Sequence, residues 1–170
     1  LVQINSINPV LVKDAPGEAE IGSFIAENLR RFGVETQVDE LETGRVNVIG
    51  TIKGTGSGRS LMLNAHMDTV GVDGMTDPFS GKIVDGKVYG RGSQDMKGSI
   101  AAMITAMKFI TENNVRLKGD LIATFVADEE YGSIGSEKIA KQIKTDAAIV
   151  TEPTDLQVCL AHKGFYLFEI

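Results

Sequence analysis

Three short apolar segments alternate with two helical patterns from position 60 onward, and this order constrains the fold more than any other feature. Residues 60–66, 119–127 and 147–152 form nearly uninterrupted apolar runs, which are typical of strands buried on both faces. Residues 96–113 and 134–143 carry apolar side chains at helical spacing. Strands separated by helices favour parallel pairing with right-handed crossovers. The sequence therefore predicts an α/β fold with a mostly parallel sheet.

The preceding residues and the segment after position 80 add further elements. Residues 17–32 place apolar side chains on one helical stripe, and residues 34–41 and 45–52 alternate as strands do. The Asp-Gly pair within KIVDGKVYG is a strong signal for a hairpin. The glycine-rich segment 54–58 fits no phosphate-loop spacing and no helical pattern follows it, so we predict a plain loop there.

Composition restricts the classes of partner. The 170 residues carry 17 basic and 23 acidic side chains, a net charge of −6, and no basic stripe, which argues against nucleic-acid binding. The uncharged stretch at 98–107 is far shorter than the roughly twenty apolar residues of a membrane span. Cys159 is the only cysteine and no secretory signal is visible, so we expect a cytoplasmic protein without disulfides or membrane contacts.

Residues able to bind a metal follow each of the three apolar strands, and one more precedes the helix predicted at 96–113. Ligands of open parallel sheets bind at the carboxyl ends of the strands, so these residues should meet at one edge. Mixed imidazole and carboxylate donors suit zinc, cobalt or manganese. The candidates are His66, Asp68, Asp95, Glu129, Glu130 and Glu152.

Four of the six candidates also have a simpler interpretation. Asp95 directly precedes a predicted helix and could be its N-cap. Glu129 and Glu130 could be solvated loop residues, and Glu152 could begin a turn before Pro153. The agreement of four separate segments favours a metal site, because clustered carboxylates repel one another unless they are protonated or bound to cations.

Two spacings refine the hypothesis. Asp68 follows His66 by two positions, so its carboxylate is expected to accept the second imidazole N–H and fix the tautomer. The adjacent acids Glu129 and Glu130 point in different directions, so that one can bind metal while the other acts as a base toward water. Metal-assisted hydrolysis requires this combination.

Four motifs, AHMDTV, GRGSQDMKGSIAA, VADEEYGSIGS and TEPT, occur in this order. Together they resemble the zinc aminoacylase and carboxypeptidase family, which includes acetylornithine deacetylase and succinyl-diaminopimelate desuccinylase. The resemblance implies a three-layer α/β/α sandwich and a metal-dependent hydrolase that cleaves the amide bond of N-acyl amino acids or short peptides. It favours the deacetylase or desuccinylase branch, and a homodimer for the full-length protein.

The resemblance also implies roles for individual residues. Asp95 would bridge two divalent metals, most commonly zinc, about 3.5–4 Å apart. His66 and Glu152 would complete one site, and Glu130 would serve the other.

In the same family Glu129 would be the general base toward a metal-bridging water, and would pass its proton to the leaving amine. Asp68 would orient His66.

The remaining ligand of the second metal is, in this family, a histidine beyond an inserted lid. We therefore expect residues 1–162 to be the N-terminal part of the metal-binding catalytic domain, and residues 163–170 to begin the lid or dimerisation domain.

His162 and Cys159 are not assigned to the site. This chain is expected to hold one metal or none, and two alternatives follow: a truncated, catalytically incomplete metal-binding module, or an acidic α/β binding domain whose carboxylates cap helices.

Overall fold

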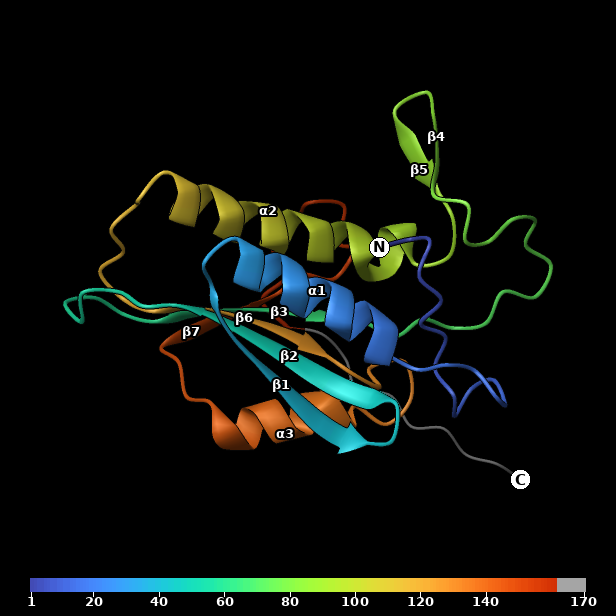
Figure 1. Cartoon of the computed structure of the whole chain (residues 1–170), viewed down its shortest axis with the longest axis horizontal. Coiled ribbons are helices and arrows are strands. Elements are labelled where there is room, and N and C mark those ends of the chain that lie inside the picture. The colour runs from blue at the N-terminus through green and yellow to red at the C-terminus, as the bar shows by residue number, and fades with distance from the viewer. Residues whose placement is uncertain (162–170) are drawn as a thin grey trace.

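The computed structural model describes residues 1–161 and centres on a mixed five-stranded sheet (Figure 1). The strand order across the sheet is β1-β2-β6-β3-β7. The strands are β1 (Glu35–Glu42), β2 (Arg45–Ile52), β3 (Leu61–His66), β6 (Leu121–Val126) and β7 (Ala147–Val150).

Strand directions confirm the predicted sheet. β2 pairs antiparallel with β1 and with β6, whereas β3 pairs parallel with β6 and with β7. Four of the five strands therefore run in one direction, and β2 alone is reversed. The parallel strands β3, β6 and β7 end at one edge of the sheet, as their crossover connections require.

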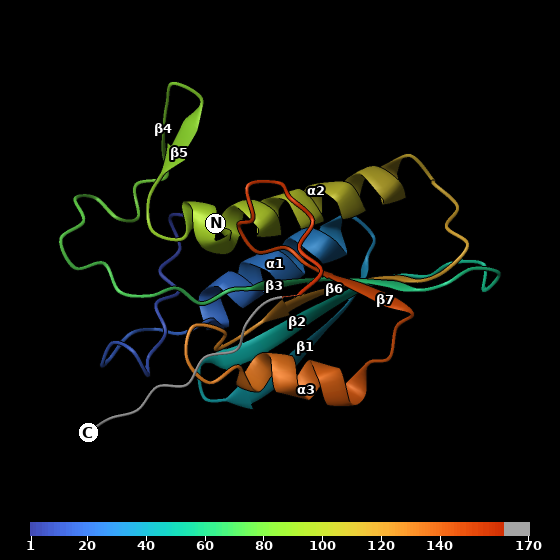
Figure 2. The same ribbon diagram turned by 180° about the vertical axis from the view of Figure 1, so that it is seen from behind.

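Helices cover both faces of the sheet, which confirms the three-layer α/β/α sandwich. Helices α1 (Ala19–Arg31) and α2 (Gly98–Glu112) lie on one face, and α3 (Ile134–Gln142) lies on the other (Figures 1 and 2). The main core lies beneath α1 and α2, where their apolar stripes meet the sheet around Phe125. The fully buried helical side chains include Ile21, Ile25, Leu29, Ile100 and Met107.

The predicted hairpin is present and projects from the sandwich (Figure 1). It consists of β4 (Lys82–Val84) and β5 (Lys87–Tyr89). Asp85 and Gly86 both have positive φ, as a tight two-residue turn of this kind requires.

Two expectations are wrong in detail. Residues 147–150 were expected to form a buried strand, but all four residues of β7 are exposed, because β7 is the edge strand and only β3 pairs with it in the described part of the chain. The helix expected from residue 96 begins at Gly98, after a kinked turn η1 (Ser93–Lys97) in which Asp95 and Met96 have non-helical backbone angles. His162 and the predicted domain boundary at 163 lie outside the described residues.

The glycine-rich segment 54–58 is a loop, as predicted, and it packs against the chain just before β6. Gly58 N–H donates to the Lys118 carbonyl at 3.0 Å. A Cβ added to Gly119 would lie 2.0 Å from the Arg59 carbonyl oxygen, so the two backbones pass too closely for any side chain.

Replacing Gly119 with alanine should therefore destabilise the protein by about 1–3 kcal/mol, because backbone atoms must move to admit the methyl group. Urea unfolding measures this loss. Gly71→Ala is the matched control, since its new methyl group would meet only the Val12 side chain at 3.2 Å. Equal midpoints for the two variants would contradict the close approach.

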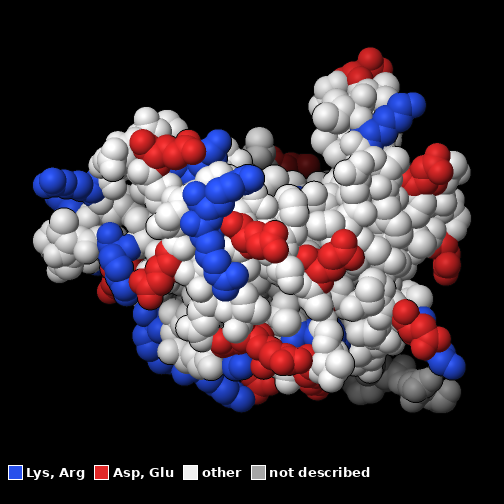
Figure 3. All heavy atoms as spheres, in the orientation of Figure 1, with Lys and Arg blue, Asp and Glu red and all other residues white. Residues whose placement is uncertain are grey.

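Surface charge is mixed. Acidic and basic side chains are interspersed over the face seen in Figure 3. Among the residues that the structure describes, no helix is both long and apolar enough to cross a membrane.

Candidate metal centre

Strand ends bring the candidate residues to one edge of the sheet. His66 is the last residue of β3, Glu129 follows β6, and Glu152 follows β7. Thr151 is held in place by hydrogen bonds from its N–H to the Asn64 carbonyl (3.0 Å) and from Ser99 Oγ to its own carbonyl (2.6 Å). The path of the chain beyond β7 is thereby fixed where Glu152 leaves the sheet.

Three of the predicted ligands, His66, Asp95 and Glu152, come together around the His66 imidazole. Its Nε2 lies 2.9 Å from Asp95 Oδ1 and 3.9 Å from Glu152 Oε2. One ligand atom from each of these three residues falls within 4.8 Å of the others. The carboxylate of Glu129 lies at the same place, with Oε2 also 3.9 Å from His66 Nε2.

These separations suit a first-row divalent metal. Zinc bound by nitrogen and oxygen at 2.0–2.2 Å in tetrahedral geometry separates its ligand atoms by roughly 3.3 Å. The observed 2.9 and 3.9 Å bracket that value, so small side-chain rotations would equalise them. The imidazole is 1% exposed while the Asp95 and Glu152 side chains are 51% and 35% exposed, which leaves one side of the group accessible.

Asp95 is not a helix cap. The N-cap of α2 is Lys97, which makes no side-chain capping bond. Asp95 lies instead in η1, where its carboxylate contacts His66. The capping interpretation of this acid is therefore wrong.

The contact between His66 and Asp68 differs from the prediction. His66 Nδ1 lies 2.9 Å from the main-chain carbonyl of Asp68 and 3.5 Å from its carboxylate Oδ1. Because β3 ends at His66, the chain no longer alternates beyond it, and the carbonyl comes closer than the side chain. A carbonyl acceptor at Nδ1 assigns a proton to that nitrogen, so a cation would bind at Nε2 in place of the second imidazole proton.

The Asp68 carboxylate has a different function in the fold, which the sequence patterns did not reveal. Its Oδ1 accepts the Glu129 N–H at 3.0 Å, and its Oδ2 accepts the Glu130 N–H at 3.1 Å. Asp68 is fully buried. It therefore links the end of β3 to the turn that carries both glutamates.

The electrostatics of the group reflect an excess of carboxylates. Burial lowers the pKa of His66, but the carboxylates of Asp68, Glu152 and Asp95 more than offset this and raise the pKa to about 10. Burial raises the pKa of Glu152, and the neighbouring acids Glu129 and Asp95 add to the effect. A bound cation would relieve this repulsion.

Glu130 lies on the adjoining turn and is not one of the three converging residues. Burial raises the pKa of Glu130 to about 7, and the charges of Asp95, Asp68 and Glu129 contribute to the increase. The Glu130 carboxylate therefore lies close enough to these three acids to be repelled by their charges.

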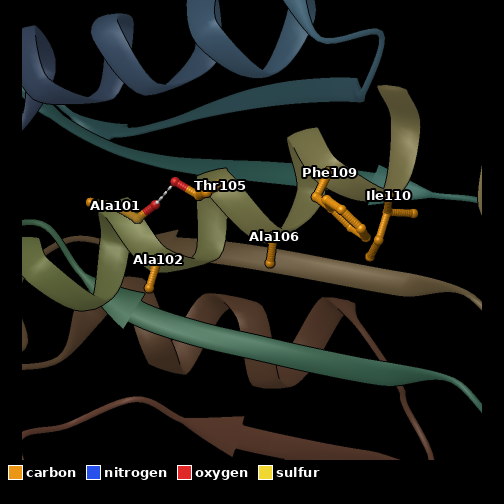
Figure 4. Close-up of a pocket in the computed structure, with 6 residues that line it drawn as sticks. All are labelled: Ala101, Ala102, Thr105, Ala106, Phe109 and Ile110. Carbon is orange, nitrogen blue, oxygen red and sulfur yellow. Dashed lines mark hydrogen bonds between the residues drawn. The ribbon is translucent and has the colours of Figure 1, made fainter. Parts of the chain in front are cut away.

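A surface depression lies elsewhere, on the outer face of α2 (Figure 4). It is shallow and apolar, and none of its lining residues titrates. They are Ala101, Ala102, Thr105, Ala106, Phe109 and Ile110. This depression therefore offers no acid, base or metal ligand for catalysis, unlike the residues at the strand ends.

The fold and this group of residues together define a metallopeptidase-like α/β domain. Residues 62–162 match the family model described as peptidase family M20/M25/M40. That match covers more than half of the chain, and the chain belongs to this family.

Individual relatives are named for several activities. The chain is 33% identical to the N-formyl-4-amino-5-aminomethyl-2-methylpyrimidine deformylase of Halalkalibacterium halodurans, over 93% of this chain and 39% of the relative. It is 38% identical to the acetylornithine deacetylase of Proteus mirabilis, over 78% of this chain and 35% of the relative.

A solved M20 family metallo-carboxypeptidase from Sulfolobus solfataricus has the same fold, with a TM-score of 0.73 at 24% identity, over 88% of this chain and 35% of that one. The chain thus spans less than two-fifths of the length of these three proteins.

Proposed function

We propose that this chain is the metal-binding part of an amidohydrolase that cleaves N-acyl amino acids or short peptides with a pair of divalent metals. The observation that carries the proposal is the convergence of Asp95 and Glu152 on the Nε2 atom of a buried His66. In this proposal Asp95 would be a ligand shared by both metals, His66 and Glu152 would complete one site, and Glu130 would serve the other.

The chemistry follows from these assignments. When bound, such metals polarise a carbonyl group and lower the pKa of water. Glu129 is the proposed general base, because its Oε2 reaches to 3.9 Å from His66 Nε2 and its backbone N–H is held by Asp68. Glu129 takes the proton from the attacking water and delivers it to the leaving amine. His66 stays oriented throughout by its bond to the Asp68 carbonyl.

Zinc is the proposed metal, with cobalt or manganese as substitutes, since all three accept mixed nitrogen and oxygen donors. Residues 1–161 supply three candidate ligands for one metal. For a second metal, only Asp95 and Glu130 are proposed. We therefore expect at most one tightly bound metal per chain, and we assign residues 1–162 to the catalytic domain.

An acetylated or succinylated amino acid is the proposed substrate, on the basis of the deacetylase and desuccinylase relatives. A cytoplasmic location and a homodimer of the full-length protein are proposed on the family resemblance.

Metal analysis combined with an amidase assay tests this function. After dialysis against zinc and then metal-free buffer, the chain should retain about one zinc and show little hydrolysis of N-acetylornithine, because the second site is incomplete. Two retained zincs with clear turnover would show that this chain is catalytically complete by itself. A chain that retains no zinc at any concentration would contradict the metal site.

A further inference from the structure

A buried polar network lies behind the candidate metal centre and joins the N-terminal segment to it. Asn8 is fully buried. Its side-chain amide donates to Asp68 Oδ2 at 2.8 Å and to Asp128 Oδ1 at 2.9 Å. Its Oδ1 accepts the Val10 N–H at 3.0 Å, which identifies the nitrogen as the atom that faces the two acids.

The first branch of the network leads to the proposed base and ligand. Asp68 accepts the amide of Asn8 on the same oxygen that accepts the Glu130 N–H, while its other oxygen accepts the Glu129 N–H. The orientation of one carboxylate therefore determines where the backbone of both glutamates lies.

The second branch fixes the start of the same turn. Arg45 donates to Asp128 Oδ1 at 2.8 Å and to Glu18 Oε2 at 2.6 Å. The Asp128 N–H donates to Glu18 Oε1 at 3.2 Å, and its Oδ2 accepts the Gly132 N–H at 3.1 Å. Arg45, Glu18 and Asp128 are all buried, so these contacts are shielded from water.

We propose that Asn8 is a positioning residue for the metal centre, which rests on the function proposed above for that site. Asp68 and Asp128 repel each other, and the two hydrogens of the Asn8 amide hold both carboxylates in place. Without this bridge the Asp68 carboxylate can rotate, and the Glu129 and Glu130 N–H groups lose their fixed acceptor. Asn8 lies outside the residues 62–162 that match the family model.

Two variants and one control test the role. Asn8→Ala removes the bridge. Asn8→Asp keeps the shape and the acceptor for Val10, but it donates no hydrogen when ionised. Asn5→Ala is the matched control, because Asn5 Oδ1 also accepts an N–H two residues on, from Ile7 at 3.0 Å, whereas Asn5 makes no hydrogen bond to Asp68 or Asp128.

Amide hydrogen exchange of the metal-free chain is the first measurement. The Glu129 and Glu130 amides should exchange about tenfold faster in both Asn8 variants, because each amide loses a fixed acceptor. The same amides should exchange at the parent rate in Asn5→Ala. Unchanged rates in either folded Asn8 variant would overturn the proposal.

Cobalt titration, followed by the visible absorption of the bound ion, is the second measurement. Loss of a group that orients metal ligands should weaken cobalt binding about 10–100-fold in the Asn8 variants. The cobalt affinity of Asn5→Ala should equal that of the parent. Faster amide exchange with unchanged cobalt affinity would reduce Asn8 to a structural residue and overturn its positioning role. A parent chain that binds no cobalt would refute the proposed function. The exchange rates of the Glu129 and Glu130 amides would still show whether Asn8 holds the backbone at these two residues.

Discussion

Replacing Asp95 with asparagine should lower the affinity of the chain for zinc by more than about 100-fold, since a ligand contributes more than the outer groups that orient it. Asparagine has the same shape, but it lacks the negative charge that a bridging ligand supplies. Asp95 Oδ1 lies 2.9 Å from His66 Nε2, so a metal placed between the converging residues must contact it. Isothermal titration of the parent and the variant with zinc measures the loss.

The fold should survive this substitution. The Asp95 side chain is 51% exposed and caps no helix, so the architecture does not depend on its charge. Asp85→Asn is the matched control, because it makes the same chemical change in the hairpin turn, where Asn-Gly is as favourable as Asp-Gly. If Asp95→Asn bound zinc as tightly as Asp85→Asn, the assignment of Asp95 as a ligand would be wrong.

Replacing Arg45 with methionine should reduce the free energy of unfolding by about 3–5 kcal/mol, because it leaves the buried acids Glu18 and Asp128 without a counter-ion. Arg45 is 4% exposed and its partners are 0% and 4% exposed. Burial by itself lowers the pKa of this guanidinium, but hydrogen bonds to the two carboxylates raise the pKa above its ordinary value. Urea unfolding measures the loss.

Two comparisons separate charge from packing. The triple variant Arg45→Met, Glu18→Gln, Asp128→Asn removes all three charges together and should recover part of the loss, because no unpaired ion remains buried. Lys53→Met breaks an ion pair whose lysine is 66% exposed, so its midpoint should stay near that of the parent. An Arg45→Met chain as stable as Lys53→Met would show that the buried network contributes nothing.

Much of the candidate site could be predicted because it depends on local pattern and strand direction. Apolar runs ending in His66, Glu129 and Glu152 predict where each side chain leaves its strand, and parallel pairing of β3, β6 and β7 then brings them to one edge. Asp95 precedes a strong helical pattern and so reaches the same edge. These inferences use only spacings of two to four residues and one topological rule.

The details within the site could not be predicted in this way. The sequence suggested the carboxylate of Asp68 as the partner of His66, but the carbonyl is closer, because β3 ends at His66 and the alternation of side chains does not continue to Asp68. The exposure of β7 depends on its place at the sheet edge, and four apolar or small residues do not reveal that place.

The sequence by itself determined the α/β class, the order of the elements and the residues that gather at the carboxyl ends of the strands, because side-chain periodicity reports local conformation. Only the tertiary structure decided which buried polar groups hold those residues in place. Asn8 and Asp128 are 120 positions apart, and Arg45 and Glu18 are 27 positions apart. Contacts of this kind depend on how whole elements pack, and no local spacing encodes them.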